Sequence, residues 1–297
     1  MKNIVKSFIC VLLLSQIGYA QENTFNEDKL LERLEVLSSD KFEGRRTGEK
    51  GNDLARAYII NEYKNIGITG FNGSYEHSFD FEIRAGKFNA KNILAFIKGT
   101  EFPKKYIVIS AHHDHLGKSG DKIYNGADDD ASGVSALLAF AEYFMQNQPK
   151  HSVILAAFDA EELGLRGSKY FVDKMKDSDI VVNINMDMIS RSAKNELYVV
   201  GTRYNKILEE VVTSFKNPTD TKLLIGHDGT DGKQNWTYTS DHGPFHRSKI
   251  PFLYFGNEDH AAYHKTTDEF TDVTPNFYKK AVKSIISLFK DLDLKGL

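Results

Sequence analysis

The sequence has a single cysteine among its 297 residues, Cys10, and this cysteine lies close to the start of the chain. A fold held together by disulfides is therefore excluded, and the chain must rely on its hydrophobic core. A membrane-spanning helix needs about 20 consecutive apolar residues, and the chain has no apolar run of that length. No transmembrane span is therefore expected. The chain has no basic cluster, internal repeat, low-complexity tract or Pro/Ser-rich linker. These absences argue against nucleic acid as a partner and in favour of one domain.

The first twenty residues have the pattern of a secretory signal peptide. Lys2 and Lys6 precede a short apolar run, and Gly18 and Ala20 supply the small residues of a cleavage site. A buried helix is the alternative interpretation of this run. Cleavage near Ala20 would leave residues 21–297 without cysteine and would change the formal charge from −3 to −5, because two lysines are lost. We therefore expect a protein that is secreted or periplasmic.

Hydrophobic patterning predicts helices and strands that alternate along most of the chain. Apolar residues at helical spacing predict helices over residues 27–38, 49–66, 132–146, 166–175 and 275–291. Apolar runs of strand length predict strands within residues 75–97 and at 106–111, 153–158, 180–186, 196–200, 222–225 and 251–255. Such alternation is typical of a parallel sheet covered on both faces. We expect an α/β fold, a three-layer sandwich whose mixed, mostly parallel central sheet has helices on both faces.

Five residues of metal-binding type occur next to these elements: His112, Asp129, Glu162, Asp187 and His264. Three of them follow or end consecutive predicted strands, and His264 lies in the loop after a later strand. In open α/β sheets, ligands bind outside the carboxyl ends of the strands, so residues from distant segments can converge there. Two imidazoles and three carboxylates can hold two divalent cations if one carboxylate bridges them. Two cations about 3.5–4 Å apart form a known hydrolytic device.

Two clusters of candidate residues allow more than one interpretation. The acids at 128–130 precede a predicted helix, where they could simply cap its N-terminus. Three adjacent acids repel one another, however, and a dication would relieve that repulsion, which favours a bridging role for Asp129. In the segment HHDH at residues 112–115, strand alternation places His112 and Asp114 on the same side. Asp114 could then hold the ring of His112, and we expect the other two histidines to point elsewhere.

Glu161 and Glu162 are adjacent acids at the end of a predicted strand, so their side chains should point in different directions. One could bind metal while the other carries protons, although the spacing does not say which, and a plain helix start is the alternative interpretation. Asp187 lies in an apolar segment, where an unpaired carboxylate would be costly without a cation or strong donors. Tyr263 precedes His264, and its hydroxyl could donate a hydrogen bond to a developing oxyanion.

In these segments the chain resembles the di-zinc aminopeptidases of the leucyl aminopeptidase and aminopeptidase Y type, which are related to glutamate carboxypeptidase and glutaminyl cyclase. The resemblance runs from about Leu30 to the C-terminal helix and includes the segments SDKFEGRRTG (residues 39–48) and SDHGPF (residues 240–245). Larger relatives insert a protease-associated domain for which residues 70–105 are too few. The resemblance therefore implies a fold of the zinc exopeptidase type and a single catalytic domain over residues 21–297.

The resemblance also implies a role for each candidate residue. His112 and Asp187 would hold one zinc ion, Glu162 and His264 the other, and Asp129 would bridge the two. Further roles would fall to Glu161 as general base, Asp114 as the residue that orients His112, and Tyr263 as an oxyanion donor. Members of the family often have a cis peptide after the bridging aspartate, here between Asp129 and Asp130.

The implied function is that of a zinc-dependent exopeptidase, an aminopeptidase that acts on peptides with a free N-terminus. The cofactors would be two Zn²⁺ per chain, with Mn²⁺ or Co²⁺ as possible substitutes. The alternatives are a one-zinc glutaminyl cyclase, whose relatives are richer in tryptophan than this chain with its single Trp, and a carboxypeptidase or dipeptidase. A carboxypeptidase would need a cation for the substrate carboxylate, and Arg191 or Arg203 could supply it. A peptide-binding protein without catalysis would require lost ligands, and none is missing.

Overall fold

The computed structural model describes residues 25–295, so the expected signal peptide lies outside the described residues. The described chain contains the α-helices α1 (Glu27–Leu37), α2 (Lys50–Ile66), α3 (Ser132–Gln146), α4 (Arg166–Lys174), α5 (Lys206–Ser214), α6 (His242–Arg247) and α7 (Pro275–Lys295). Its strands are β1 (Thr69–Gly70), β2 (Glu76–Ile83), β3 (Gly86–Ile97), β4 (Phe102–His112), β5 (Gly117–Ser119), β6 (Lys122–Tyr124), β7 (His151–Phe158), β8 (Asp179–Met186), β9 (Glu196–Val200), β10 (Lys222–Ile225) and β11 (Phe252–Gly256).

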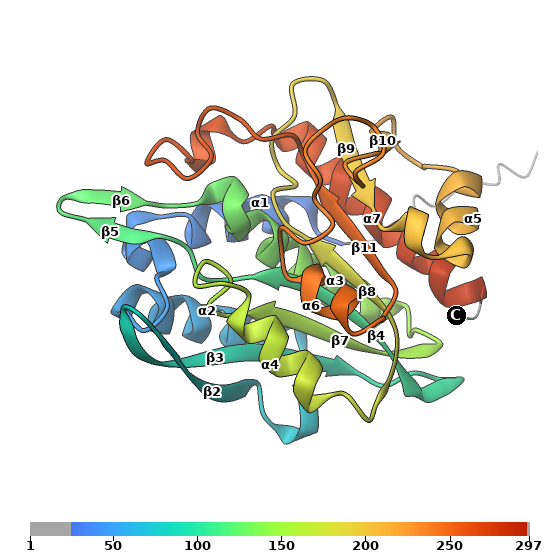
Figure 1. The fold of residues 1–297 in the computed structure, drawn as a ribbon, viewed down its shortest axis with the longest axis horizontal. Helices are drawn as coiled ribbons and strands as arrows, with labels where there is room; N and C mark the ends of the chain where they lie inside the picture. Colours follow the sequence, from blue (N-terminus) through green and yellow to red (C-terminus); the bar gives the residue numbers. More distant parts are fainter. Residues whose placement is uncertain (1–24, 296–297) are drawn as a thin grey trace, which may run out of the picture.

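Nine of these strands form one twisted mixed sheet (Figure 1). The strand order is β1-β3-β7-β4-β8-β11-β9-β10, and β2 pairs with β3 at one edge. The four central strands β7, β4, β8 and β11 run parallel to one another. Pairing is antiparallel towards the edges, between β3 and β7 and between β11 and β9. The carboxyl ends of the central strands therefore meet at one edge of the sheet, as the sequence predicts.

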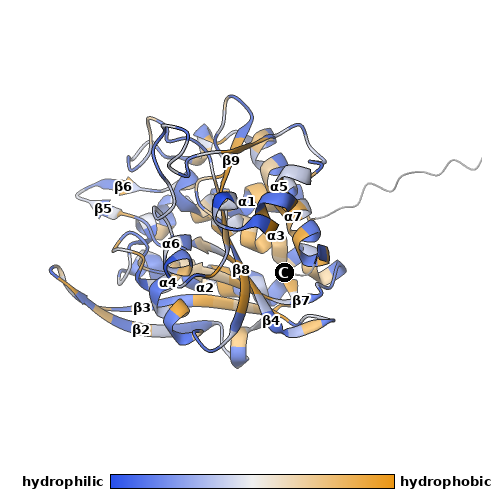
Figure 2. Cartoon of the chain, turned by 45° about the vertical axis from the view of Figure 1, so that its right-hand side comes forward, coloured by the Kyte–Doolittle hydropathy of each residue, from blue (hydrophilic) through white to orange (hydrophobic). Residues whose placement is uncertain are grey.

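Helices cover both faces of this sheet. Alternate residues of β7 show the two layers: Leu155 packs in the large core with α1, α2, α3, α5 and α7, and Ile154 packs in a second cluster with α4 and α6. Every residue of β7 is buried, which explains why its sequence is continuously apolar instead of alternating. Figure 2 shows the hydrophobic residues concentrated in the central strands and the adjoining helix faces, with hydrophilic residues in the outer loops. The expected three-layer α/β architecture is thus confirmed.

The predicted elements agree with the observed ones to within a few residues at most ends, and three of them, residues 132–146, 196–200 and 222–225, match in full. The stretch 70–105 forms β2, β3 and the start of β4. Hydrophobic patterning does not predict α5, α6 or the β5–β6 hairpin, which projects beside the carboxyl edge (Figure 1). Between residues 25 and 295, no helix is long and apolar enough to cross a membrane.

Candidate metal centre and active site

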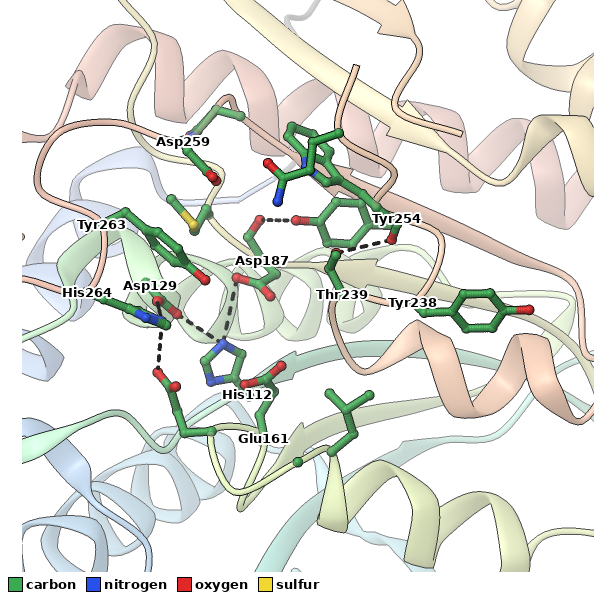
Figure 3. Close-up of a pocket in the computed structure, with 17 residues that line it drawn as sticks. His112, Asp129, Glu161, Asp187, Tyr238, Thr239, Tyr254, Asp259, Tyr263 and His264 are labelled. Atoms are coloured by element: carbon green, nitrogen blue, oxygen red, sulfur yellow. Dashed lines mark hydrogen bonds and ion pairs between the residues drawn. The ribbon is translucent and has the colours of Figure 1, made fainter. Parts of the chain in front are cut away.

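The five predicted ligands line one cavity at the carboxyl edge of the sheet, and Figure 3 labels all of them except Glu162. His112 is the last residue of β4, and Asp187 directly follows β8. Glu162 lies in the turn between β7 and α4, and Asp129 lies in the irregular turn that leads into α3. His264 comes from the long loop after β11. Each residue stands where a buried parallel strand or its following loop reaches the same edge, which is how the topology gathers distant segments.

Asp129 joins two groups of donor atoms. Its Oδ1 lies 3.2 Å from Nε2 of His112, which is 3.7 Å from Oδ1 of Asp187. Its Oδ2 lies 3.2 Å from Nε2 of His264, which is 3.6 Å from Oε1 of Glu162. Atoms bound to one zinc ion at about 2.0–2.1 Å in a tetrahedron are separated by about 3.3–3.4 Å. The observed spacings match this separation, so the residues fit two metal ions with Asp129 between them.

The electrostatics of the centre also suit a cation. Burial alone would favour the neutral imidazole of His112, yet the carboxylates of Asp187 and Asp129 raise its pKa well above the usual value. Burial likewise opposes the ionised form of Asp129, but the imidazoles of His115, His112 and His264 hold its pKa well below the usual range. The group therefore binds positive charge strongly, whether that charge is carried by protons or by metal ions.

The sequence left open whether the acids at 128–130 bind metal or cap a helix, and in the structure different acids are placed for each role. Asp129 faces the metal centre, and the peptide bond between Asp129 and Asp130 is cis, as the resemblance implies. Asp130 instead accepts hydrogen bonds from the backbone N–H groups of Gly133 at 2.9 Å, His112 at 3.1 Å and Met188 at 3.3 Å. Asp130 thus accepts a hydrogen bond from the first turn of α3. Its carboxylate also links that turn to the end of β4 and to the residues after β8.

Asp128 and Asp268 secure the same turn from its other side. Asp128 accepts hydrogen bonds from both N–H and O–H of Ser190 at 2.7 Å and from the amide of Asn257 at 3.0 Å. Asp268 in turn accepts hydrogen bonds from the backbone N–H groups of Asp128 and Asp129 at 3.1 Å. The backbone of Asp129 is therefore held in the turn, while its carboxylate faces the donor atoms of the candidate metal centre.

A buried guanidinium supports the loop beneath this turn and explains the Gly44-Arg45 segment of the sequence. Arg45 donates hydrogen bonds to the carbonyl oxygens of Asn125 at 2.6 Å, Leu37 at 2.8 Å and Gly126 at 3.0 Å. An added Cβ at Gly44 would lie 2.4 Å from the carbonyl oxygen of Gly117, and its φ of +68° also favours glycine. The N-terminal helices are thus connected to the loop that carries Asp129.

The arrangement around Asp114 differs from the expectation. Nδ1 of His112 faces the backbone carbonyl of Asp114 at 3.0 Å, while the carboxylate lies 3.8 Å away. That carboxylate accepts hydrogen bonds from the backbone N–H groups of Glu161 at 3.0 Å and Glu162 at 3.3 Å. Asp114 therefore orients His112 through its main chain and fixes the turn of both glutamates through its side chain.

The expectation that His113 and His115 both point away is half wrong. Nε2 of His113 does turn away, to the carbonyl oxygen of Lys91 at 3.1 Å. Nδ1 of His115 instead lies 2.9 Å from Oε1 of Glu162 in the metal centre. Strand alternation does not apply to His115, because β4 ends at His112 and the following residues belong to no strand. A third imidazole in the HHDH segment was the only sign of this residue in the sequence.

Glu161 and Tyr263 line the cavity next to the clusters without belonging to either. Burial, together with the nearby Asp241 and Asp187, raises the pKa of Glu161 well above its usual value, as suits a group that exchanges protons. Burial and the carboxylates of Asp129 and Asp187 raise the pKa of Tyr263, so its hydroxyl stays protonated as a donor. The ring of Tyr263 stacks on that of His264 with centroids 3.9 Å apart.

The cavity over the clusters has a volume of about 340 Å³, with one polar and one aromatic wall. The loop between β10 and α6 contributes Gln234, Trp236, Tyr238 and Thr239. Asp259 adds a carboxylate at the rim. Among the described residues that line the cavity there is no lysine or arginine. The cavity therefore combines acidic groups with an aromatic surface.

The sequence of this chain matches one family of known proteins. The profile of peptidase family M28 matches residues 92–289, well over half of the chain and all five predicted ligands. Aminopeptidase YwaD of Bacillus subtilis is 31% identical over 169 residues, which cover 54% of this chain and 34% of that protein. A probable zinc metalloprotease of Pyrenophora teres f. teres is 29% identical over 163 residues, 50% of this chain and 33% of that protein. The matched region spans only about a quarter to a third of the curated relatives.

Solved structures resemble the fold over nearly the whole chain. BSAP, a zinc aminopeptidase from Bacillus subtilis, superposes with a TM-score of 0.74 and 17% identity, covering 90% of this chain and 95% of that one. A glutaminyl cyclase of Fimbriiglobus ruber superposes with a TM-score of 0.70 and 14% identity, covering 90% and 95%. At such identities the likeness establishes the fold and leaves the choice between these chemistries to the site.

Proposed function

This chain belongs to peptidase family M28, and on that premise we propose that it is a zinc-dependent aminopeptidase that removes N-terminal residues from peptides. The observation that carries this proposal is the pair of donor clusters that share Asp129, with contacts of 3.2 Å from its two oxygens to His112 and His264. Each cluster has the spacing of ligands around one zinc ion, and a carboxylate that bridges two metals is the basis of two-metal hydrolysis.

The proposed roles of the ligands follow from their positions. His112 and Asp187 would hold one ion, Glu162 and His264 would hold the other, and Asp129 would be shared between them. The mixture of imidazole and carboxylate suits zinc, and Mn²⁺ or Co²⁺ would also be accepted. When bound, the two ions lower the pKa of a water molecule and polarise the scissile carbonyl of the peptide.

The remaining steps belong to side chains beside the ligands. Glu161 takes a proton from the attacking water and delivers it to the departing amine, because it lies in the cavity and burial raises its pKa. Tyr263 donates a hydrogen bond to the oxyanion that forms on the carbonyl. Asp114 positions the turn of Glu161 and Glu162 through its contacts of 3.0 and 3.3 Å to their N–H groups.

The charges of the cavity favour an aminopeptidase over a carboxypeptidase. A free α-amine is a cation, and the carboxylates of Glu161 and Asp259 line the cavity as possible partners. The two arginines that could have bound an α-carboxylate lie elsewhere. Arg191 is 3.6 Å from Asp272, and Arg203 donates a hydrogen bond to the carbonyl oxygen of Asp228 at 3.0 Å. Neither residue lines the cavity.

The test combines metal content with hydrolysis. The purified protein should contain two metal ions per chain and should release the chromophore from aminoacyl-p-nitroanilides, and a chelator should abolish this release. One bound metal, no release, and cyclisation of an N-terminal glutamine would instead establish a glutaminyl cyclase. Two metals with hydrolysis only at C-terminal residues or of dipeptides would establish a carboxypeptidase or a dipeptidase. Metals with peptide binding but no turnover would establish a non-catalytic relative.

The proposal includes export. Lys2 and Lys6, followed by a short apolar run and by Gly18 and Ala20, support cleavage near Ala20 and a secreted or periplasmic enzyme. Residues 21–297 would then act as one catalytic domain, a view supported by the one nine-stranded sheet among the described residues. N-terminal sequencing of protein recovered from the periplasm or medium tests this: a chain that begins near Gln21 is expected, and an intact Met1 in the cytoplasm would contradict it.

A further inference from the structure

His115 has the environment of a metal ligand. Its side chain is fully buried, and Nδ1 lies 2.9 Å from Oε1 of Glu162 and 3.8 Å from Oδ2 of Asp129. Within the described part of the chain, neither nitrogen of this ring has a hydrogen-bond partner, and the same holds for Oε1 of Glu162. The two atoms are close enough for a hydrogen bond but lack its geometry, so the lone pairs of both can be offered to a cation.

The surrounding backbone fixes this orientation of the ring. Gly126 provides the space for it, because a Cβ at that position would lie 2.6 Å from Cδ2 of His115. The backbone N–H of His115 donates to the carbonyl oxygen of Arg45 at 3.3 Å. A buried imidazole and a buried carboxylate oxygen without partners would each be costly. A cation shared between them would remove that cost, and the atoms are held in place to receive it.

We propose that His115 is a third imidazole ligand of the metal centre, bound through Nδ1 to the same ion as Asp129, Glu162 and His264. The donor atoms of His115, Asp129 and Glu162 all lie within 4.8 Å of one another. The ring of His264 approaches from another side, tilted by 58° with its centroid 6.0 Å from that of His115. The inference rests on the two-metal site of the proposed function and extends it by one ligand.

This ligand makes the two halves of the centre unequal. The ion at His115 would have four protein ligands, which is the number typical of a closed tetrahedral site. The ion at His112 would have three protein ligands, which are His112, Asp129 and Asp187, and would keep one open position. Glu161 lies beside His112 (Figure 3). The site would thus consist of one tightly held ion and one ion open to water and substrate. We expect the closed half to bind zinc more tightly and to fill first.

The direct test is nuclear magnetic resonance of the mature protein loaded with ¹¹³Cd²⁺ in place of zinc. Ring protons of a histidine couple to ¹¹³Cd only when that ring binds the metal. Three coupled imidazoles are expected, and the cross peaks of one should disappear in His115→Gln. Coupling from only two imidazoles in a protein that holds two Cd²⁺ would overturn the inference, and would leave His115 as a residue that only contacts Glu162.

Zinc titration against a chelating competitor gives an independent result, with circular dichroism to check folding. His115→Gln should weaken one of the two sites by more than about 100-fold, beyond the 10- to 100-fold that loss of a supporting contact costs. His113→Gln is the matched control, since this neighbouring buried ring faces Lys91 at 3.1 Å, and it should leave both affinities within about threefold. Two sites of unchanged affinity in His115→Gln overturn this inference alone. A single zinc in the wild-type chain overturns the proposed function and this inference with it.

Discussion

At the scale of single residues, the two adjacent glutamates of the candidate site occupy different positions. Oε1 of Glu162 lies 3.6 Å from His264 within a ligand cluster, while Glu161 stands in the cavity outside both clusters. Asp114 holds the N–H groups of both residues, so the turn that directs them apart is itself fixed. The spacing of the sequence could not assign the two roles, because it does not show which way each side chain leaves a turn.

This division predicts different outcomes for two conservative variants. Glu161→Gln keeps the shape of the side chain but cannot take up a proton, so kcat should fall by about 10²- to 10⁴-fold with two zinc ions still bound. Glu162→Gln should instead lose one zinc ion, because a neutral amide is a poorer ligand than a carboxylate. Steady-state kinetics and metal analysis of the two purified variants provide the measurement. If Glu161→Gln lost zinc while Glu162→Gln kept it, the two roles would be exchanged.

Asp241 is a buried carboxylate whose ionisation should destabilise the fold. Its side chain is fully buried, and this burial raises its pKa from 3.8 to about 6. Between pH 3.8 and about pH 6, Asp241 keeps a proton in the folded chain that it has lost in the unfolded chain. The stabilisation from that proton is complete below about pH 4 and is lost as the pH rises through about 6. The loss amounts to at most about 3 kcal/mol.

Asp241→Asn should therefore stabilise the metal-free protein at neutral pH, although it replaces a buried residue. Urea unfolding in the presence of chelator should give the variant a larger free energy of unfolding than the wild type at about pH 7, and no such gain at about pH 4. Asp121→Asn, at an exposed turn between β5 and β6, is the control and should show no pH-dependent gain. A variant that is destabilised equally at both pH values would contradict this account.

At the scale of elements, the junction of α3 with the ends of β4 and β8 determines the geometry of the centre. Asp130 accepts hydrogen bonds from N–H groups in α3, at the end of β4 and two residues after β8, and Gly133 allows these segments to approach. A Cβ at Gly133 would lie 2.5 Å from both Oδ2 of Asp130 and the carbonyl oxygen of Met186. Helix α3 is therefore seated against the sheet at the position where the ligands His112 and Asp187 emerge.

Gly133→Ala should consequently destabilise the protein by about 2–3 kcal/mol, since the added methyl group must push backbone or Asp130 aside. It should also weaken zinc binding, because the N–H of His112 is held by Asp130. Gly243→Ala in α6 is the matched control: its Cβ would have no neighbour closer than 3.4 Å, and alanine favours a helix. Chemical unfolding and zinc titration of both variants supply the measurements, and equal stabilities for the two would refute the role of the junction.

Elements with long apolar patterns were predictable from the sequence, and short ones were not. Strands such as β7 are buried on both faces, so their sequences are continuously apolar and unambiguous. Helix α6 has only six residues and contains Gly243 and Pro244, which hides any helical pattern. Helix α5 did have a signal, because Asn205 caps it and accepts from the N–H groups of Ile207 and Leu208. His115 was missed for a related reason: alternation predicts side-chain directions only while the strand lasts.

At the scale of the whole molecule, the metal centre connects segments that are far apart in the chain. About half of the sequence lies between His112 and His264, and the ligands between them come from separate strands and loops. An unfolded chain cannot hold these atoms together, so zinc binds the folded state and its binding free energy adds to the stability of the fold. Carboxylates that repel one another in the metal-free centre strengthen this coupling, because the cations neutralise them.

Removal of zinc should therefore lower the melting temperature of the entire protein and not loosen only one loop. With free zinc at 100 times Kd, each site contributes about 2.7 kcal/mol, which corresponds to about 5–10 °C for a chain of this size. Calorimetry over a range of free zinc concentrations should show one transition whose midpoint rises with zinc. Asp129→Asn, which weakens both clusters at once, should show a much smaller rise than Glu162→Gln, which should keep the contribution of the site at His112. A melting temperature in chelator equal to that of the zinc-loaded protein would show that the fold does not depend on these ligands.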